Sequence, residues 1–571
     1  MENVSPNAIA TNSRTSWARR LLIVPLLLTA ILLPAQKVVT ITVDASKPLG
    51  PFQPAWAWVG HDEPNYTYSE QGRNLLQELS QLSPYPVHDR THNLLTSGDG
   101  TPALKWGSTN AFTLDASGKP VYDWAIIDRI FDTYKATGII PFVEIGFMPA
   151  SLSTHPEPYQ HHWPRDFATG WSYPPKNYDE WSELVYRWVR HMVDRYGATE
   201  VSKWEWEVWN EPDIFYWHGT VDEYCKLYDY TVAAVKRALP TALVGGPAST
   251  SPSNQKAATF LRQFLEHCAN GQNYATAKKG APLDFISFHA KGRAAMVDGH
   301  VELNVGTHLR DIDQGFAIIE DFPTLRKLPV VISEADPESC AACNVASHPE
   351  SGYRLTSQYA SYEAELLNGT VALAERHHIN LQGSVSWAFT FPGQPIFAGL
   401  RAFATDNIDL PVLNAFRLFG QMKGERLATR SDGALELDEV LRSSVRTKAN
   451  VDAIATRESH RVNVLLWQYD DDDSSGSSAA EVQLVVKGLP RDVPRMLLEH
   501  WLIDRDHSNA YTVWQKLGSP PNPSSAQYQQ LKTAGQLQLL ESPRWMAVDG
   551  DTIVLTFSEP VEGVSLLDLT W

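Results

Sequence analysis

The stretch Trp204-Glu205-Trp206-Glu207-Val208-Trp209-Asn210-Glu211-Pro212 decides the fold of this 571-residue chain. Its first six residues are mostly large and apolar, which is typical of a buried parallel strand, and the last three form the loop that follows. The stretch Leu328–Pro337 has the same plan, because the apolar run Val330-Val331-Ile332 leads to Ser333-Glu334. Each of these two predicted strands therefore has a glutamate at its carboxyl end.

Eight runs of this kind follow one another along the chain, with amphipathic stretches between them, of which Tyr178–Tyr196 is the clearest. The predicted strands are Ala55–Val59, Val87–His92, Ile140–Ile145, Trp204–Trp209, Leu243–Gly246, Phe285–His289, Val330–Glu334 and Val385–Phe389. Eight strand–helix repeats over residues 51–425 predict an α/β fold, a (β/α)8 TIM barrel. An open doubly wound sheet is the alternative, and the lack of a glycine-rich phosphate loop after any strand disfavours it.

The sequence changes character after about residue 425. Short strand-like runs alternate with clusters of Gly, Pro, Ser and Asp, which predicts an accessory C-terminal β-sandwich over residues 426–571. A strand-like segment at residues 36–50 precedes the barrel, and we expect it to join the sandwich. The run Asp470–Asp473 with Ser474–Ser478 predicts a solvated hairpin loop without a function of its own.

Residues 1–35 have the features of an export signal. Arginines precede the apolar run Leu21–Leu33, which is short for a membrane span and is interrupted by Pro25. We expect an exported protein, periplasmic or secreted, and an uncleaved N-terminal membrane anchor is the alternative. The formal net charge of −18 argues against nucleic acid or an anionic membrane surface as a partner.

The four cysteines are Cys225, Cys268, Cys340 and Cys343. The spacing Cys340-Ala341-Ala342-Cys343 lacks the second pair that a zinc site needs, so in an exported chain we expect a local disulfide there. Cys225 and Cys268 are expected to be buried thiols.

Glu211 follows strand four and Glu334 ends strand seven, and these two strands lie on opposite sides of a barrel of eight. Active sites of such barrels lie at the carboxyl ends of the strands. Two carboxyl groups about 5–5.5 Å apart cleave a glycosidic bond with retention of configuration. The pair therefore predicts a retaining glycoside hydrolase, with Glu211 as acid/base, Glu334 as nucleophile and an oligosaccharide or glycoside as substrate. This mechanism needs no metal or organic cofactor, and a non-catalytic carbohydrate-binding barrel is the alternative.

Further polar residues end other predicted strands and face the same mouth. Asn210 is a candidate donor to the sugar 2-hydroxyl. His92 and His289 end strands two and six and are candidate substrate contacts, and Trp387 in strand eight is a candidate floor for the sugar. Glu144 ends strand three and is expected to be a structural partner of a buried cation rather than a catalytic acid.

The stretches Val87–His92, Ile139–Pro149, Val208–Pro212 and Asp284–His289, followed by Glu334, resemble glycoside hydrolase family 39, which holds β-xylosidases and α-L-iduronidases. The resemblance covers roughly residues 38–425. It implies the same roles for the two glutamates, and it implies exo-acting cleavage of terminal sugar residues.

The chain departs from the β-xylosidase pattern at two places. Lys291 stands where that pattern has a tyrosine, and Glu334-Ala335-Asp336-Pro337 follows the iduronidase branch, which uses cations to bind a sugar carboxylate. Lys291, with Arg401 as a second candidate cation, would favour a uronate, and an ion pair between Lys291 and Asp336 is the alternative. We expect β-xylosidase-like activity first and α-L-iduronidase-like or arabinosidase-like activity second.

Overall fold

The structure is a computed structural model that describes residues 38–161, 167–168, 170–446, 448–472, 474 and 476–571. The predicted export signal or anchor at residues 1–35 lies outside these ranges. Among the helices of the described ranges, none combines the length and the apolar character that crossing a membrane would take.

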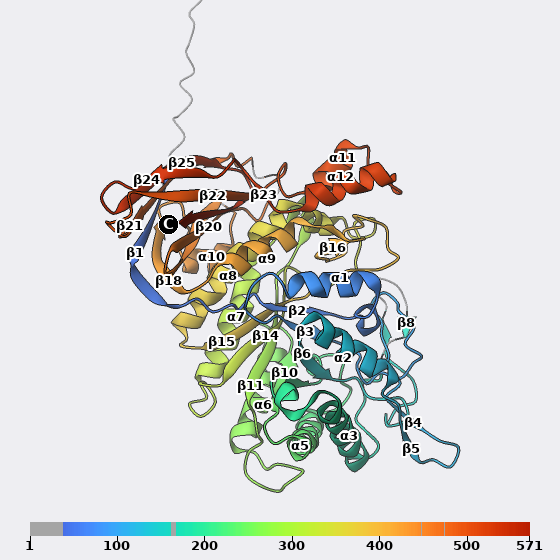
Figure 1. Cartoon of the computed structure of the whole chain (residues 1–571). Helices are drawn as coiled ribbons and strands as arrows, with labels where there is room; N and C mark the ends of the chain where they lie inside the picture. The colour runs from blue at the N-terminus through green and yellow to red at the C-terminus, as the bar shows by residue number, and fades with distance from the viewer. Residues whose placement is uncertain (1–37, 162–166, 169, 447, 473, 475) are drawn as a thin grey trace, which may run out of the picture. The chain divides into compact units, whose positions relative to one another are not determined.

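A closed barrel of eight parallel strands forms the centre of the fold (Figure 1). In chain order its strands are β2 (Trp58–His61), β3 (His88–Thr91), β6 (Ile140–Ile145), β9 (Glu205–Val208), β10 (Leu243–Ser249), β11 (Phe285–Lys291), β14 (Pro329–Asp336) and β15 (Asn380–Ser386). Every strand predicted from the sequence overlaps one of these, so the prediction of a TIM barrel is confirmed. The open doubly wound sheet is excluded, because β15 pairs with β2 and closes the barrel.

One helix follows each barrel strand along the chain. These helices are α1 (Glu70–Leu79), α2 (Ala125–Thr137), α3 (Tyr178–Tyr196), α5 (Val221–Ala238), α6 (Gln255–Asn270), α7 (Val305–Glu320), α8 (Ser357–Arg376) and α9 (Pro411–Gln421). In α3, Asn177 caps the first turn by accepting from two backbone N–H groups, and the helix stops at Gly197, whose φ of 88° suits glycine. Trp181, Leu184 and Trp188 lie on its buried face, as their 3–4 residue spacing predicts.

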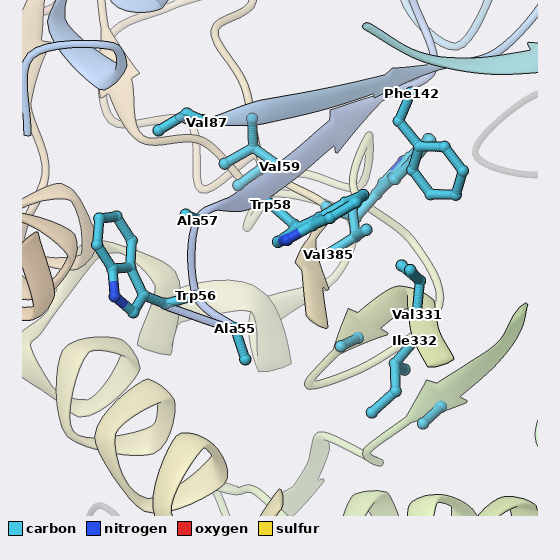
Figure 2. Close-up of a cluster of buried hydrophobic side chains, with 14 of the residues drawn as sticks. Ala55, Trp56, Ala57, Trp58, Val59, Val87, Phe142, Val331, Ile332 and Val385 are labelled. Carbon is cyan, nitrogen blue, oxygen red and sulfur yellow. The ribbon is translucent and has the colours of Figure 1, made fainter. Parts of the chain in front are cut away.

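Large side chains fill the barrel interior toward its amino-terminal end. Trp58 of β2 meets Phe142 of β6 edge to face at 5.4 Å, and Phe142 meets Phe285 of β11 at 5.7 Å. Figure 2 shows Trp58 and Phe142 side by side in this cluster, with Val385 nearby. A Cβ on Gly383 would lie 2.5 Å from the Trp58 ring, so only glycine leaves room for it. This packing makes the barrel a filled core, and chemistry is confined to its mouth.

A ten-stranded sheet forms the second part of the described chain. It contains β1 (Val39–Pro51), β18 (Glu425–Ser431), β19 (Asn450–Glu458), β20 (Arg461–Tyr469), β21 (Ala480–Lys487), β22 (Arg495–Ile503), β23 (Gln538–Leu539), β24 (Arg544–Ala547), β25 (Thr552–Glu559) and β26 (Val564–Thr570). The N-terminal strand β1 pairs with both β18 and β21. Strands distant in the sheet order, such as β21 and β26, share one hydrophobic core, so the sheet folds onto itself as a sandwich.

Two details of this part differ from the sequence prediction. The sequence predicts one of the short strands at Gly535–Leu540, but Gly535 ends α12 (Ser525–Gly535) and only Gln538–Leu539 pairs. The loop that begins at Asp470 is not fully solvated, because Asp470 and Asp471 are both buried. Asp471 accepts hydrogen bonds from the backbone N–H of Val305 at 3.1 Å, where α7 begins, and from that of Val445 at 3.0 Å. A carboxylate at a helix N-terminus is stabilising, so this loop joins the sandwich to a barrel helix.

Candidate active site

Glu211 and Glu334 meet at the mouth of the barrel. Glu211 lies in the loop after β9, with φ 44°, and its N–H donates to Ala248 O in β10 at 2.9 Å. Glu334 lies in β14 directly beside His289 of β11 in the strand register. One oxygen of each glutamate and one ring nitrogen of His289 all lie within 4.8 Å of one another. This spacing matches the short carboxyl separation of retaining glycosidases and is well below that of inverting ones.

Three cationic side chains contact the carboxylate of Glu334. Arg90 Nη1 donates to Oε1 at 3.0 Å, His92 Nε2 lies 3.1 Å from the same oxygen, and Lys291 Nζ lies 2.5 Å from Oε2. Burial alone would raise the pKa of Glu334, but His289, Lys291 and His92 around it hold that pKa well below its usual range. Glu334 is therefore ionised, as a nucleophile must be.

Arg90 is fully buried and organises the site from β3. Its Nε donates to Glu207 at 2.6 Å, and its Nη2 donates to the amide oxygen of Asn210 at 3.0 Å. Asn210 thus points its amide nitrogen elsewhere, which suits the predicted contact with a sugar hydroxyl. Glu144 lies 3.6 Å from Arg90 Nη2 and 3.1 Å from His92 Nε2, so it partners the buried cations as expected.

Glu211 has a very different environment. Burial, together with the negative charge of Glu334, raises the pKa of Glu211 to about 7. Its Oε1 lies 2.9 Å from His289 Nδ1, and burial lowers the pKa of His289 to about 3, so this imidazole is neutral. A protonated carboxyl beside a neutral imidazole is equipped to give its proton to a leaving oxygen.

Lys291 contacts two carboxylates at once. Its Nζ pairs with Glu334 and also forms a short ion pair with Asp336, which faces it in the strand register. The predicted ion pair between Lys291 and Asp336 is therefore present. Lys291 also lines the pocket, so it borders the space where a substrate would bind.

The structure contradicts the assignment of Arg401 as a second cation for the substrate. Its side chain is fully buried, and its Nε donates to Trp387 O at 2.8 Å. Its Nη1 donates to Glu338 Oε1 at 2.9 Å, and its Nη2 lies 3.2 Å from Asp336. Sequence position after a strand does not show which way a side chain points, and Arg401 supports the pocket from within the protein.

Trp387 lies just after β15 rather than inside it. Its ring centroid is 4.4 Å from that of His92 and 5.2 Å from the guanidinium carbon of Arg90. A Cβ on Gly60 would meet the ring at 2.4 Å. Only 2% of Trp387 is exposed, so its observed role is to hold His92 and Arg90 in place, and contact with a sugar stays a prediction.

A cavity of about 420 Å³ opens beside Glu211 and Lys291, which is the size of a small-ligand site. Its other lining residues are Ile214, Thr250, Ser251, Gly292, Arg293, Ala294, Glu338, Ser339, Cys340, Cys343, His348, Glu350, Ser351 and Arg354. Cys340 and Cys343 form the predicted disulfide in its wall. Arg354 donates to the carbonyls of Cys340 at 2.5 Å and Cys343 at 2.8 Å, which fixes this wall from behind.

Sequence reasoning missed several residues that shape the site. Asp62 directly follows β2 and contacts His92, so the rule applied to the other strand ends would have found it. Glu207 lies inside β9 and was taken as part of an apolar strand. Arg354 and Glu338 come from the segment after β14, and nothing in the sequence showed that they are paired at 2.8 Å.

The donor types of Glu211, His289 and Glu334 also suit a metal ion. The three cations around Glu334 would repel a dication, so the arrangement fits acid–base and nucleophilic chemistry better. A second group consists of His300 and Glu302 of β13 (His300–Glu302) and Asp472 after β20, and there Glu302 is paired with Arg446.

Comparison with known proteins agrees with this chemistry. The family model "Glycosyl hydrolases family 39" matches residues 39–553. The chain is 28% identical to a β-xylosidase of Geobacillus stearothermophilus over 443 residues, which are 76% of this chain and 78% of that protein. It is 26% identical to the α-L-iduronidase of Canis lupus familiaris over 552 residues, which are 92% and 77% of the two chains.

A solved β-xylosidase structure from Caulobacter crescentus has the same fold. Its TM-score is 0.73 at 22% sequence identity, over 93% of this chain and 99% of that one. The family model covers most of the sequence, including both glutamates. The chain therefore belongs to glycosyl hydrolases family 39 and is a glycoside hydrolase that acts on a carbohydrate substrate.

Proposed function

We propose that this enzyme is a retaining exo-glycosidase of the β-xylosidase type, with Glu211 as acid/base and Glu334 as nucleophile. The observation that carries the proposal is the pairing of these two carboxyls within 4.8 Å in opposite ionisation states. Two carboxyl groups held in different protonation states are the usual signature of acid and nucleophile assignments.

In the first step, Glu334 attacks the anomeric carbon while the proton of Glu211 passes to the leaving oxygen. A glycosyl ester forms on Glu334, and the carboxylate charge disappears. Because that charge is one cause of the raised pKa of Glu211, its loss favours ionised Glu211. In the second step, Glu211 takes a proton from water, the water oxygen attacks the anomeric carbon, and Glu334 leaves as a carboxylate.

The substrate assignment rests on the β-xylosidase relatives and on the state of Lys291. Two curated β-xylosidases match the chain at 28% and 26% identity. Lys291 is already paired with Glu334 and Asp336, so little of its charge remains for a sugar carboxylate. The second candidate is an α-L-iduronidase-like activity, and it is favoured by the iduronidase relatives and by the position of Lys291 and Arg293 on the pocket wall.

A panel of aryl glycosides tests both candidates. We expect release of nitrophenol from the β-D-xyloside at a kcat/KM at least tenfold above that for the α-L-iduronide and the α-L-arabinoside. Preferred cleavage of the iduronide would overturn the xyloside assignment and leave the catalytic pair intact. Retention is tested separately by NMR of the first-formed anomer, and an inverted product would contradict the roles given to Glu211 and Glu334.

We also propose that the enzyme is exported. A disulfide in the pocket wall suits an oxidising compartment. Fractionation of cells that express the full chain tests this, and enzyme activity confined to the cytosol would contradict it.

A further inference from the structure

Asp62 is a buried carboxylate that the proposed chemistry does not use. It lies directly after β2 and is 3% exposed. Its Oδ1 lies 3.0 Å from His92 Nδ1, and its Oδ2 accepts from Lys105 Nζ at 2.8 Å. It therefore acts through a neighbour, and that neighbour is a histidine in contact with the nucleophile.

His92 stands between Asp62 and Glu334. With Nδ1 facing Asp62, the ring turns Nε2 toward Glu334 Oε1 and Glu144 Oε2, each 3.1 Å away, and toward Arg90 Nη1 at 2.8 Å. A carboxylate that accepts from one imidazole nitrogen fixes both the ring orientation and the proton on that nitrogen. The ring of Trp387, 4.4 Å away, limits any other orientation.

We propose that Asp62 is a positioning residue for the nucleophile: its carboxylate keeps His92 charged and turned toward Glu334, and so keeps Glu334 ionised. The inference rests on the proposed role of Glu334. Its chemistry is that of a carboxylate–imidazolium–carboxylate chain, in which the outer carboxylate stabilises the central cation.

Other charged groups also face the row of side chains Asp62, His92 and Glu334. They are Arg90 from β3, Glu144 from β6, Glu207 from β9, Glu211 from the loop after β9, His289 and Lys291 from β11, and Glu63 and Lys105 beside Asp62. Arg90 and Lys291 carry their charge in any case, because their pKa values are raised from already high ones. His92 differs, because burial and the charge of Arg90 lower its pKa, while Glu144, Asp62 and Glu334 raise it to about 9. Its charge therefore depends on these carboxylates, and Asp62 is the one of the three that contacts Nδ1.

The arrangement of Asp62, His92 and Glu334 would serve both chemical steps. When Glu334 attacks, the imidazolium orients the oxygen that does not form the new bond. When the ester breaks, the imidazolium stabilises the carboxylate that returns. Loss of the Asp62 charge should therefore slow the formation and the hydrolysis of the ester together.

The test is the Asp62→Asn variant, which keeps one oxygen that can accept from Nδ1 and removes the negative charge, together with the oxygen that accepts from Lys105. With an aryl glycoside that the wild type cleaves, we expect the acid limb of the kcat/KM profile to move up by about one pH unit or more. We also expect kcat to fall about tenfold or more, because a neutral His92 no longer stabilises the carboxylate of Glu334 as the ester breaks. Asp62→Glu should restore part of the acid limb, because it restores the charge.

Glu63→Gln is the matched control. Glu63 adjoins Asp62, is equally buried and accepts from the backbone N–H of Lys105 at 2.6 Å. Burial and the charge of Asp62 raise the pKa of Glu63 to about 8, so this carboxyl group is largely neutral at pH 6. Replacing it with the neutral amide of Gln should therefore change the charge of the site little. The acid limb should stay within about 0.3 pH unit of wild type, a shift worth about a factor of two.

An unchanged acid limb in Asp62→Asn, or a lower melting temperature with an unchanged pH profile, would reduce Asp62 to a structural role and overturn the proposal. Should Asp62→Asn fail to fold, ¹⁵N-histidine NMR of the wild type decides the question. His92 with both nitrogens protonated at pH 7 agrees with the proposal, and a neutral ring at pH 7 refutes it.

Trapping with a 2-deoxy-2-fluoro glycoside followed by peptide mass spectrometry tests the underlying function on its own. Label on Glu334 with a normal acid limb in Asp62→Asn would overturn only the role of Asp62. Label on another residue would overturn the proposed function itself.

Discussion

The loop after β9 and the carboxyl end of β14 each supply one glutamate. The charges that surround these two glutamates are very different. Three cationic groups contact Glu334, whereas the described contact of the Glu211 carboxyl is the neutral His289. The two side chains are chemically identical and lie within 4.8 Å of each other. The difference shows that the role of each glutamate is set by what the neighbouring strands place around it, because environment alone separates their pKa values.

The largest effect should come from removing the nucleophile. Glu334→Ala deletes the attacking oxygen and leaves Arg90, His92 and Lys291 facing a small empty space. We expect kcat/KM for an aryl glycoside to fall by about 10⁴-fold or more, as for removal of other catalytic nucleophiles.

Azide is the control for Glu334→Ala, because it can enter the vacated space and attack the anomeric carbon. Rescue should give a glycosyl azide of inverted configuration, which NMR identifies. Retention in that product would show that Glu334 is not the attacking group.

Removing the proton donor should have a smaller effect that depends on the substrate. Glu211→Gln keeps the shape and loses the proton, so we expect a loss of about 10²–10⁴-fold for a poor leaving group such as a methyl glycoside. A dinitrophenyl glycoside needs little protonation, so its first step should be nearly normal and an ester should accumulate as a burst. An equal loss for both substrates would contradict the acid role of Glu211.

The pH profile tests the same contrast without mutation. Activity requires protonated Glu211 and ionised Glu334. Since the pKa of Glu211 is about 7, kcat/KM should fall tenfold per pH unit above that value. Since the pKa of Glu334 lies well below 4.5, the acid limb should lie below pH 4.5. In Glu211→Gln the basic limb should disappear and the acid limb should remain. If the acid limb disappeared instead, the roles of Glu211 and Glu334 would have to be exchanged.

The sequence predicted the barrel and the pair of glutamates because both follow from local rules. Apolar runs with regular spacing identify parallel strands, and the carboxyl end of a barrel strand carries the chemistry. Such rules do not give side-chain direction. Arg401 was expected in the pocket and is buried behind it, and Asp471 was expected in solvent and holds the start of α7.

The contacts that hold the catalytic side chains in place could not be predicted from the sequence for the same reason. Arg90 lies 117 residues from Glu207 and 120 residues from Asn210 in the sequence. Only the closure of the barrel brings these side chains together. Glu338 and Arg354 lie in a segment without strand periodicity. A sequence pattern records what one element needs, whereas these contacts depend on several elements meeting at one place.

Lys291 offers a finer test of the Glu334 side. Lys291→Met keeps the length of the side chain and removes a cation 2.5 Å from the nucleophile, so the acid limb should rise by about one pH unit. Arg293→Met is the control, because Arg293 is an exposed residue of the same pocket. Its acid limb should stay at the wild-type position. An unshifted limb in Lys291→Met would mean that Arg90 and His92 alone keep Glu334 ionised.

The smallest effect on catalysis should come from the disulfide in the pocket wall. Cys340 and Cys343 enclose only two residues, so their crosslink contributes about 2 kcal/mol by loop entropy. Arg354 donates to the carbonyls of the same two cysteines and pairs with Glu338 at 2.8 Å. Arg354→Met would remove one of the two guanidinium partners of Glu338 and leave Arg401 as the other, so we expect a cost of about 3 kcal/mol, the lower end for breaking a buried pair. Thermal unfolding should therefore shift less in the double variant Cys340→Ser/Cys343→Ser than in Arg354→Met, with kcat/KM within about threefold of wild type, a change below 1 kcal/mol. A larger shift in the cysteine variant would mean that the covalent link, not the buried guanidinium, holds this wall.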